Sequence, residues 1–582
     1  MTLSANIQQQ YEKWLNDPAI DDATRQELLA IVDEPKEIED RFYRDLEFGT
    51  GGLRGVIGAG TNRINLYTVG RATQGLAQFL LAQSPAAMQL QAQTGAGESG
   101  SVPAVAIAYD SRHMSPEFAL EAALVLAGNG IRAYVFKALR PTPELSFAVR
   151  HLGANAGIVV TASHNPPEYN GYKVYGSDGG QLVTQDAAAV TAQISSITAF
   201  EQVKRLSIEE ADAQGLIIWL GAEIDEAFIS AVTAISQHPE IVREQSEHMN
   251  IVYTPLHGAG NLPVRIALER IGFANLHVVP QQERPDANFS TVKSPNPEER
   301  EAFTLALELA KQRNADLIIG TDPDCDRMGA VVKDAGGDYI VLTGNQSGAL
   351  MLHYLLSSLQ EKGTLPANGV VIKTIVTSEL GATIARHYGV EVMNTLTGFK
   401  YIGEKMTQFE HTGSHQFLFG YEESYGYLAG TYARDKDGVL AAMLIAEAAA
   451  YYKAKGRTLY EVLDDLYCQH GYFLEKLESR TMKGKDGLDQ IRRIMNAWRT
   501  QPPTHIADTA ITQVLDYSLG LDGLPKENVL KYVLADGSWF CLRPSGTEPK
   551  IKVYFAVKGS SSESANEQLT RLVQAVMVQV DG

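Results

Sequence analysis

Short apolar, β-branched runs recur along the chain, and each ends in polar loop residues that lead toward a helical pattern. Alternating strands and helices are typical of α/β units built on a mostly parallel sheet. In such sheets ligands gather at the carboxyl ends of the strands, and the polar motifs fall at those ends. The runs are VAIAYDSRH (105–113), GIVVTASHNPP (157–167), IVYTPLHGAG (251–260), LIIGTDPDCDR (317–327) and VVIKTIVTS (370–378).

The chain is too long for one ordinary core. Its 582 residues predict three to five domains at roughly 100–200 residues each. The α/β units resemble one another loosely, whereas the segment 528–557 indicates strands joined by tight turns, followed by a helix over 561–578. We therefore expect three similar α/β domains over 1–205, 206–335 and 336–460, and a smaller α+β domain over 461–582.

Charge and composition exclude several classes of partner. The net charge of −19 opposes nucleic acid and anionic membranes, so an anionic ligand requires a local concentration of basic residues. No apolar run approaches the ~18 residues of a membrane span, and the amino end lacks a secretory pattern. The three scattered cysteines fit a reducing compartment. We expect a cytoplasmic protein with a small-molecule partner, as a monomer or homodimer.

The motif TASHNP (161–166) places a serine just beyond a predicted buried strand. Asn165 and Pro166 favour a sharp turn that would push Ser163 outward. The residues alone leave two interpretations open, an exposed nucleophile or phosphate carrier and an ordinary polar turn. The motif is not G-x-S-x-G, so an α/β-hydrolase is not indicated.

The motif TDPDCDRMG (321–329) contains three alternating aspartates. In an extended loop Asp322, Asp324 and Asp326 would point to one side, where hard oxygen ligands suit Mg²⁺. A calcium-binding EF-hand loop would need Gly and Glu where this chain has Arg327 and Lys333. A solvated acidic turn is the alternative.

A third motif, RPSGTEPK (543–550), has the composition of a phosphate clamp. Arg543 offers a planar fork of donors, Ser545 and Thr547 offer hydroxyls, and Gly546 lets backbone N–H groups converge on an anion. An ordinary hairpin turn is the alternative.

Two further segments contain groups suited to a sugar. In GYEESYG (420–426), Glu422 and Ser424 alternate and can point into one cleft. In TLTGFK (395–400), Phe399 can cover an apolar sugar face. The basic residues that could supply local positive potential are Arg54, Arg112, Lys173, Arg327, Lys436 and Arg543.

Together, TASHNP, DPDCDR, GYEESYG and RPSGTEP resemble the motifs of the α-D-phosphohexomutases, in the same order and over nearly the whole chain. Within that family the chain is similar to the longer bacterial phosphoglucomutases. The resemblance implies four domains around a central cleft: three similar α/β domains with mixed sheets and a smaller α+β domain.

The resemblance also implies roles for individual residues. It implies a phosphoserine at Ser163, Mg²⁺ bound by that residue and the three aspartates, and Lys173 as a general acid/base candidate. The catalytic candidates are Ser163, His164, Lys173 and Arg54. The substrate-binding candidates are Arg112, Arg327, Thr397, Gly398, Phe399, Glu422, Ser424, Lys436, Arg543, Ser545, Gly546 and Thr547.

The implied reaction interconverts glucose 1-phosphate and glucose 6-phosphate through a phosphoserine and glucose 1,6-bisphosphate, which also serves as activator. The chain departs from the glucose-type pattern at Tyr421, which interrupts G-E-E-S, and at Phe399, where many glucose mutases carry Trp. A phosphomannomutase, a phosphopentomutase and a hexose 1,6-bisphosphate synthase are the alternatives within the family. A non-catalytic phosphosugar sensor and a phosphatase are alternatives from other classes.

Overall fold

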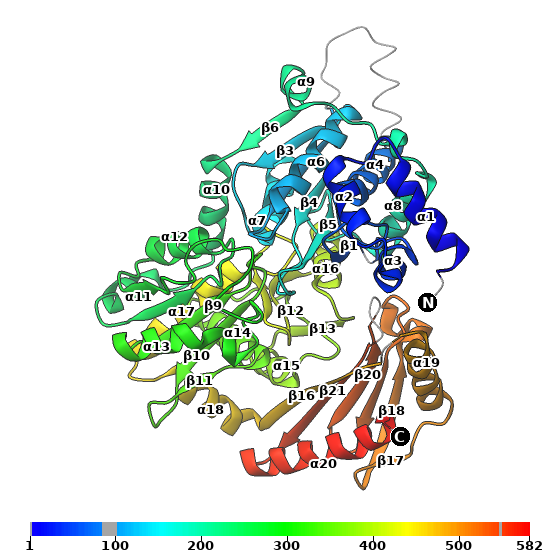
Figure 1. The fold of residues 1–582 in the computed structure, drawn as a ribbon. Helices are drawn as coiled ribbons and strands as arrows, with labels where there is room; N and C mark the ends of the chain where they lie inside the picture. The colour runs from blue at the N-terminus through cyan, green and yellow to red at the C-terminus, as the bar shows by residue number, and fades with distance from the viewer. Residues whose placement is uncertain (1–2, 50, 84–101, 483, 546–549, 582) are drawn as a thin grey trace.

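Four β-sheets follow one another along the chain, and helices cover them (Figure 1). The computed structural model describes residues 3–49, 51–83, 102–482, 484–545 and 550–581, with residues 484–486 described without their side chains. All five predicted strands are present, as β2, β4, β7, β9 and β12. In the part of the chain that is described, no helix combines the length and the apolar character needed to cross a bilayer.

Three helices at the amino end pack on the first domain. Two begin at capping side chains, because Ser4 and Asp21 accept hydrogen bonds from backbone N–H groups of the first turn. Trp14 and Phe42 pack edge to face with their ring centroids 5.9 Å apart, which fixes the first of these helices against the third. The helices are α1 (Ala5–Asn16), α2 (Asp22–Ala30) and α3 (Pro35–Phe42).

The first sheet has the order β1-β5-β4-β2-β3-β6. Its last four strands are parallel, whereas β5 and β1 are antiparallel additions at one edge. Because β6 lies beyond residue 205 and still pairs with β3, we propose that the first domain extends to about residue 220. The elements are β1 (Gly52–Val56), α4 (Leu66–Gln83), β2 (Ala104–Tyr109), α6 (Ser115–Gly128), β3 (Arg132–Phe136), α7 (Thr142–Leu152), β4 (Ala156–Val160), β5 (Tyr169–Gly176), α8 (Thr184–Ser196), η1 (Phe200–Gln202), α9 (Ile208–Ala213) and β6 (Ile217–Leu220).

The second sheet has the order β11-β10-β9-β7-β8, with β9, β7 and β8 parallel and the other two antiparallel. The acidic motif forms the turn between β9 and β10, at the carboxyl end of β9. The elements are α10 (Ala222–Thr233), α11 (Pro239–Gln245), β7 (Ile251–Thr254), α12 (Asn261–Ile271), β8 (Leu276–Val278), η2 (Arg300–Phe303), α13 (Thr304–Arg313), β9 (Leu317–Thr321), β10 (Met328–Lys333) and β11 (Tyr339–Val341).

The third sheet has the order β13-β12-β14-β15, with only β15 antiparallel. The turn between β14 and β15 holds the GYEESYG motif. Helix α17 is buried along most of its length. The elements are α14 (Gly344–Glu361), β12 (Gly369–Thr374), α15 (Glu379–His387), β13 (Glu391–Thr395), α16 (Phe399–Thr412), β14 (Gln416–Glu422), β15 (Gly426–Ala429), α17 (Gly438–Ala454) and α18 (Leu459–His470).

The C-terminal domain is an antiparallel sheet, β16-β21-β20-β19-β18-β17, with α19 and α20 packed on it. The α+β prediction for this part of the chain is confirmed. The elements are β16 (Tyr472–Thr481), α19 (Gly484–Thr500), β17 (His505–Ile506), β18 (Thr509–Asp516), η3 (Tyr517–Leu519), η4 (Leu521–Gly523), β19 (Leu530–Leu534), β20 (Trp539–Pro544), β21 (Lys550–Gly559) and α20 (Ser562–Asp581).

The cores of these domains are not equally connected. One hydrophobic core is continuous through the first three domains and includes Phe136, Tyr253 and Phe419. The C-terminal domain has its own core, which includes Trp498 and Phe540. It meets the third domain through a smaller apolar cluster.

Candidate active site

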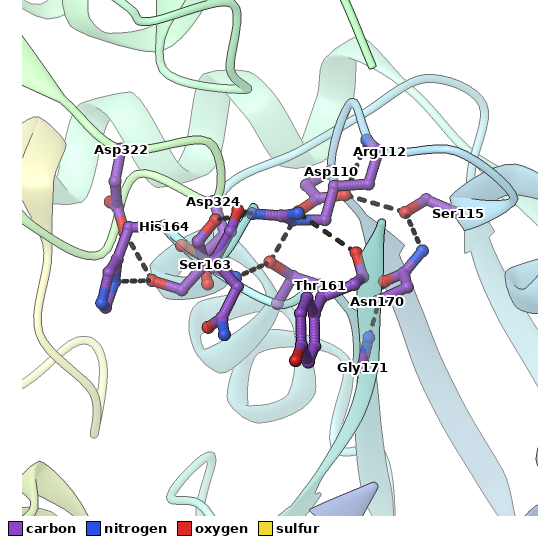
Figure 2. Close-up of polar contacts among 12 residues, drawn as sticks. Asp110, Arg112, Ser115, Thr161, Ser163, His164, Asn170, Gly171, Asp322 and Asp324 are labelled. Carbon is purple, nitrogen blue, oxygen red and sulfur yellow. Dashed lines mark hydrogen bonds and ion pairs between the residues drawn. The ribbon is translucent and has the colours of Figure 1, made fainter. Parts of the chain in front are cut away.

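Ser163 lies three residues beyond β4, at a turn whose backbone is strained. Its φ of +52° is in the left-handed region, which is unfavourable for a residue with a Cβ and is often found at functional sites. The hydroxyl donates to Asp322 Oδ2 at 2.6 Å and lies 3.2 Å from His164 Nδ1. Ser163 is 3% exposed. The turn therefore aims the hydroxyl at the acidic loop of the second domain (Figure 2).

A buried polar network lies beside the serine turn and bonds to it (Figure 2). Arg112 donates to the carbonyl oxygens of Ser163 at 2.5 Å and of Pro166 at 2.8 Å. Asp110 accepts from Ser115 Oγ at 2.8 Å and from Thr161 Oγ1 at 2.6 Å, and it pairs with Arg112 at 3.3 Å. We expected Arg112 among the substrate-binding residues. Its side chain is instead fully buried and bonded to the serine turn.

The three aspartates of the acidic loop meet at one point. Carboxylate oxygens of Asp322, Asp324 and Asp326 lie within 4.8 Å of one another, and all three side chains are buried. The Oδ1 atoms of Asp324 and Asp326 have no hydrogen-bond partner among the described residues. Buried carboxylates are costly unless they are paired or bind a metal. The cluster can therefore hold a metal ion.

Close packing against a neighbouring loop of the same domain, which contains Gly258 and Ala259, fixes the shape of the acidic loop. Gly258 approaches so closely that a Cβ would lie 2.5 Å from Pro323 Cα, and Ala259 N donates to Pro323 O at 2.8 Å. Cys325 has a φ of +51°. From the first domain, Thr142 donates to Asp324 through its backbone N–H at 2.9 Å and its hydroxyl at 3.0 Å.

Two lysines neutralise part of the acidic cluster. Lys173 on β5 lies 2.9 Å from Asp324 Oδ2 and 3.5 Å from Asp326 Oδ2. Lys436, just before α17, lies 2.8 Å from Asp326 Oδ2. These contacts connect the first and third domains to the acidic loop.

Burial and neighbouring charge act in opposite directions on the aspartates. Burial raises the pKa of Asp322 well above its ordinary value, and the charges of Asp324 and Asp326 add to this shift. Burial also opposes ionisation of Asp324, but the nearby lysines, Lys173 first, and a hydrogen bond with Asp322 together outweigh it and lower the pKa of that carboxyl. The three carboxyls thus have unequal pKa values, as expected where like charges crowd together.

His164 carries an imidazole next to the serine hydroxyl. Burial lowers the pKa of His164 well below its ordinary value, and the charges of Arg327 and Arg54 lower it further. The ring is therefore neutral at physiological pH, and the lowered pKa makes it a weak base. Arg54 on β1 donates to Asn165 Oδ1 at 3.2 Å, which places it beside the same turn.

A cleft of about 810 Å³ brings most of the predicted residues together. A second recess of about 560 Å³ shares several of its walls and also reaches Ser163, Lys173 and Asp326. Basic residues outnumber acidic ones along the cleft, although the chain as a whole is acidic. The predicted residues that line the cleft are Arg54, His164, Arg327, Thr397, Gly398, Phe399, Glu422, Ser424, Lys436, Arg543 and Ser545.

The two predicted sugar loops contact each other in this cleft. Glu422 at the end of β14 accepts a hydrogen bond from Gly398 N at 2.9 Å, and burial raises the pKa of its carboxyl. Tyr425 closes the same turn with a φ of +63°. Phe399 lines the cleft but is 3% exposed, so it forms part of the wall.

The C-terminal domain supplies the opposite side of the cleft. Alternate side chains of β20 face opposite sides of a strand, so Phe540 and Leu542 enter the domain core while Arg543 lines the cleft. Ser545 lines the cleft and donates its backbone N–H to Lys550 O at 2.7 Å. The predicted Gly546 and Thr547 lie outside the described residues.

Several residues of the site were not predicted from the sequence. Asp110 and Thr161 lie inside the quoted runs. Their place directly after two predicted strands is the sequence signal that could have identified them. Glu423 and Glu298 line the cleft, and Glu298 forms an ion pair with Arg327. Nothing in the local sequence of Glu298 indicates this contact.

Sequence comparison matches four successive segments to the four domains of one family. These are described as phosphoglucomutase/phosphomannomutase alpha/beta/alpha domain I (residues 45–201), domain II (226–337) and domain III (343–470), and the C-terminal domain (478–574). Structural comparison agrees on the fold. A phosphoglucomutase/phosphomannomutase family protein from Burkholderia thailandensis has a TM-score of 0.64 at 18% identity, over 92% of this chain and 98% of that one. Parafusin, a phosphoglucomutase from Paramecium in its open form, has a TM-score of 0.66 at 16% identity, over 93% and 95%.

Curated relatives are similar over nearly their whole length. A phosphoglucomutase from Staphylococcus epidermidis (strain ATCC 12228) is 38% identical over 90% of this chain and 92% of the relative. A phosphoglucomutase from Staphylococcus aureus (strain USA300) is 37% identical over 93% and 95%. The order of the motifs, the four matched domains and this identity lead to one conclusion: the chain belongs to the phosphoglucomutase/phosphomannomutase family.

Proposed function

We propose that the chain is a phosphoglucomutase that interconverts glucose 1-phosphate and glucose 6-phosphate through a phosphate on Ser163. The observation that carries this proposal is the contact between the Ser163 hydroxyl and Asp322 at 2.6 Å, at the end of a cleft with basic walls. A phosphoryl group on that oxygen would lie between the acidic cluster and the cleft. The curated relatives named phosphoglucomutase support glucose as the sugar.

We propose Mg²⁺ as the ion held by Asp322, Asp324 and Asp326. The two Oδ1 atoms that accept no hydrogen bond from any described residue, and the all-oxygen donor set, support this assignment. When bound, the ion would neutralise charge on the phosphoryl group. Lys173 and Lys436 hold the carboxylates in place from the neighbouring domains.

The substrate's existing phosphate would bind at the C-terminal side of the cleft, on Arg543 and Ser545, with Gly546 and Thr547 completing the predicted clamp. A guanidinium fork matches phosphate geometry. Glu422 and Ser424 would bind sugar hydroxyls between the two phosphate positions. Phosphoryl transfer depends mainly on such positioning.

In the first transfer, the free hydroxyl oxygen of the substrate forms a bond to phosphorus as the bond from phosphorus to Ser163 Oγ breaks. Lys173 and His164 line the same recess and are the two candidates to take up the hydroxyl proton. Glucose 1,6-bisphosphate then turns end for end, and the reverse step returns its other phosphate to Ser163. Added glucose 1,6-bisphosphate would restore enzyme that has lost its phosphate.

Substitution of Ser163 tests the proposal. In Ser163→Ala we expect no phosphate on the intact protein by mass spectrometry and a loss of glucose 1-phosphate turnover by several orders of magnitude. Ser195→Ala, an exposed serine on α8, is the matched control and should keep both. Turnover at the wild-type rate in Ser163→Ala would refute the phosphoserine mechanism.

The metal assignment has a readout that does not depend on activity. Mg²⁺ should raise the Tm of the wild-type protein, because a ligand that binds only the native state stabilises it. Asp324→Asn should abolish that shift. An equal Mg²⁺-dependent shift in this variant would place the ion elsewhere.

A substrate panel tests the sugar. We expect glucose 1-phosphate to be converted faster than mannose 1-phosphate or ribose 1-phosphate, with no accumulation of bisphosphate. Faster conversion of mannose 1-phosphate or ribose 1-phosphate, or release of the bisphosphate, would identify one of the alternatives named above.

We further propose a cytoplasmic location. The three cysteines are free thiols among the described residues, which is typical of a reducing compartment.

A further inference from the structure

The loop between β12 and α15, residues 375–378, lies between the C-terminal domain and the sugar loop. It follows the carboxyl end of β12, and Val376 lines the cleft. Ile375 and Val376 also belong to the apolar cluster that joins the third domain to the C-terminal domain. Three sets of contacts converge on this short segment.

The first set comes from β19 of the C-terminal domain. Lys531 donates to the carbonyl oxygen of Ile375 at 2.6 Å. It is 8% exposed, and its Nζ lies 4.0 Å from the centroid of the Trp539 ring. A buried lysine is costly unless its charge is satisfied. The hydrogen-bond acceptor that the structure gives it belongs to another domain.

The orientation of Lys531 follows from strand alternation. Leu530, Tyr532 and Leu534 point into the core of the C-terminal domain. Lys531 therefore points to the other face of the sheet, together with Trp539 and Cys541, which belong to the interdomain cluster.

The second set comes from β16 of the same domain. Asn345 Nδ2 donates to Glu475 Oε2 at 3.2 Å, and Asn345 Oδ1 accepts from Ser378 N at 3.1 Å. Ser378 caps α15 by accepting from Leu380 N at 3.1 Å. Two strands of the C-terminal domain thus contact the two ends of the 375–378 loop. Strand β19 contacts its start directly, and β16 contacts its end through Asn345.

The third set connects the loop to the sugar-binding turn. Glu423 Oε2 lies 3.4 Å from Thr374 Oγ1 and 3.3 Å from Thr377 Oγ1, and both hydroxyls can donate to it. The two hydroxyls are 2.8 Å apart. Glu423 lines the cleft, and its neighbours in the sequence, Glu422 and Ser424, line it as well.

Lys373 holds the loop from inside the third domain. This side chain is 1% exposed and donates to Glu379 Oε1 at 2.8 Å and to Thr377 O at 3.1 Å. These internal bonds hold the carboxyl-terminal end of the loop, whereas the Ile375 carbonyl at its start accepts a hydrogen bond from Lys531 of the C-terminal domain.

We propose that Lys531 is a positioning residue, which couples docking of the C-terminal domain to the placement of Glu423 in the sugar-binding turn through the 375–378 loop. The coupling rests on the proposed function of the cleft. When the C-terminal domain is docked, Lys531 and Glu475 fix the loop, and Thr374 and Thr377 fix the Glu423 carboxylate. Substrate phosphate bound by Arg543 on the same domain would thereby order the sugar site.

The first test substitutes Lys531→Met, which keeps the length of the side chain and removes its donor. Hydrogen exchange in the ligand-free protein should become faster at residues 375–378 and 420–426, while α19 and α20 keep their protection. Lys558→Met, an exposed lysine on β21 of the same domain, should leave both segments unchanged. Unchanged exchange at 420–426 in Lys531→Met would overturn the coupling, whatever reaction the enzyme catalyses.

The second test is a double-mutant cycle that combines Lys531→Met with Thr377→Val. Thr377 is at the other end of the proposed path, which runs from Lys531 through the 375–378 loop to Glu423. We expect each single variant to lower kcat/KM for glucose 1-phosphate by about 10-fold, a typical loss for a hydrogen bond to a charged group. If the path is shared, the double variant should be within about 2-fold of the worse single variant. Independent, multiplicative losses would overturn the proposal. Activity absent from the wild-type protein would refute the proposed function, and the exchange experiment would still decide the coupling.

Discussion

The two halves of the cleft are built in different ways. At the serine and its acidic loop, the side chains are almost completely buried, and contacts such as Ser163 with Asp322 and Lys173 with Asp324 cross between the first two domains. A continuous core supports this half. At the proposed phosphate clamp, Arg543 belongs to a domain with a separate core, which meets the third domain through the smaller cluster.

This difference separates two tasks of a phosphoryl-transfer enzyme. The charged groups around the transferred phosphoryl group act best when they are fixed in advance. The groups that bind the rest of the substrate must admit it, release it and exclude water in between. We infer that the first half is preorganised and that the second is completed when the C-terminal domain docks. The same substitution placed in each half should therefore have different consequences.

The largest effect is expected for Arg112→Lys in the preorganised half. Lysine keeps the charge, but it cannot reproduce the planar fork that binds the carbonyls of the serine turn. We expect the free energy of unfolding to fall by about 2–4 kcal/mol, because buried polar groups lose their partners, and kcat to fall with it. Chemical denaturation and steady-state kinetics measure the two effects.

The control for this substitution is Arg205→Lys, at an arginine whose side chain is 54% exposed and pairs with Glu121. It should change neither stability nor kcat. Wild-type stability in Arg112→Lys would show that the serine turn holds its shape without the guanidinium, and the preorganised half would then need another explanation.

A smaller effect is expected for Arg543→Lys in the docking half. Here the lost fork faces the cleft, so the folded state without substrate should keep its Tm. KM for glucose 1-phosphate should rise about 10-fold, because bidentate binding of phosphate is lost. A fall in Tm with an unchanged KM would reverse the comparison and make Arg543 a structural residue.

The sequence predicted the contiguous parts of this site and the fold that holds them. Ser163 and the three aspartates are in compact motifs, and the loops that carry them follow strands that could be recognised by composition. The structural role of Arg112 was missed because its acceptors are backbone carbonyls, which leave no trace in side-chain identity. The contact of Lys531 with Ile375 joins residues 156 positions apart. It exists only because two domains dock, and local periodicity cannot indicate such docking.

The smallest effect concerns the pH dependence of stability at the docking interface. Burial raises the pKa of Glu423 and of Glu475 to about 7, whereas an unfolded glutamate titrates near 4.5. Between these values the native state binds protons that the unfolded state has released. Stability therefore falls as pH rises from about 4.5 to about 7, by the linkage relation.

The variant Glu475→Gln should remove part of this slope, because a neutral amide is buried at every pH. We expect the loss of stability of the C-terminal domain between pH 5 and pH 8 to become smaller in this variant, measured by thermal unfolding at a series of pH values. Glu563→Gln, on α20 and exposed, should keep the wild-type slope. An unchanged slope in Glu475→Gln would mean that Glu475 ionises without cost, as it would if water reached the interface. The C-terminal domain would then be undocked for much of the time, and the contrast between a fixed half and a docking half would become sharper.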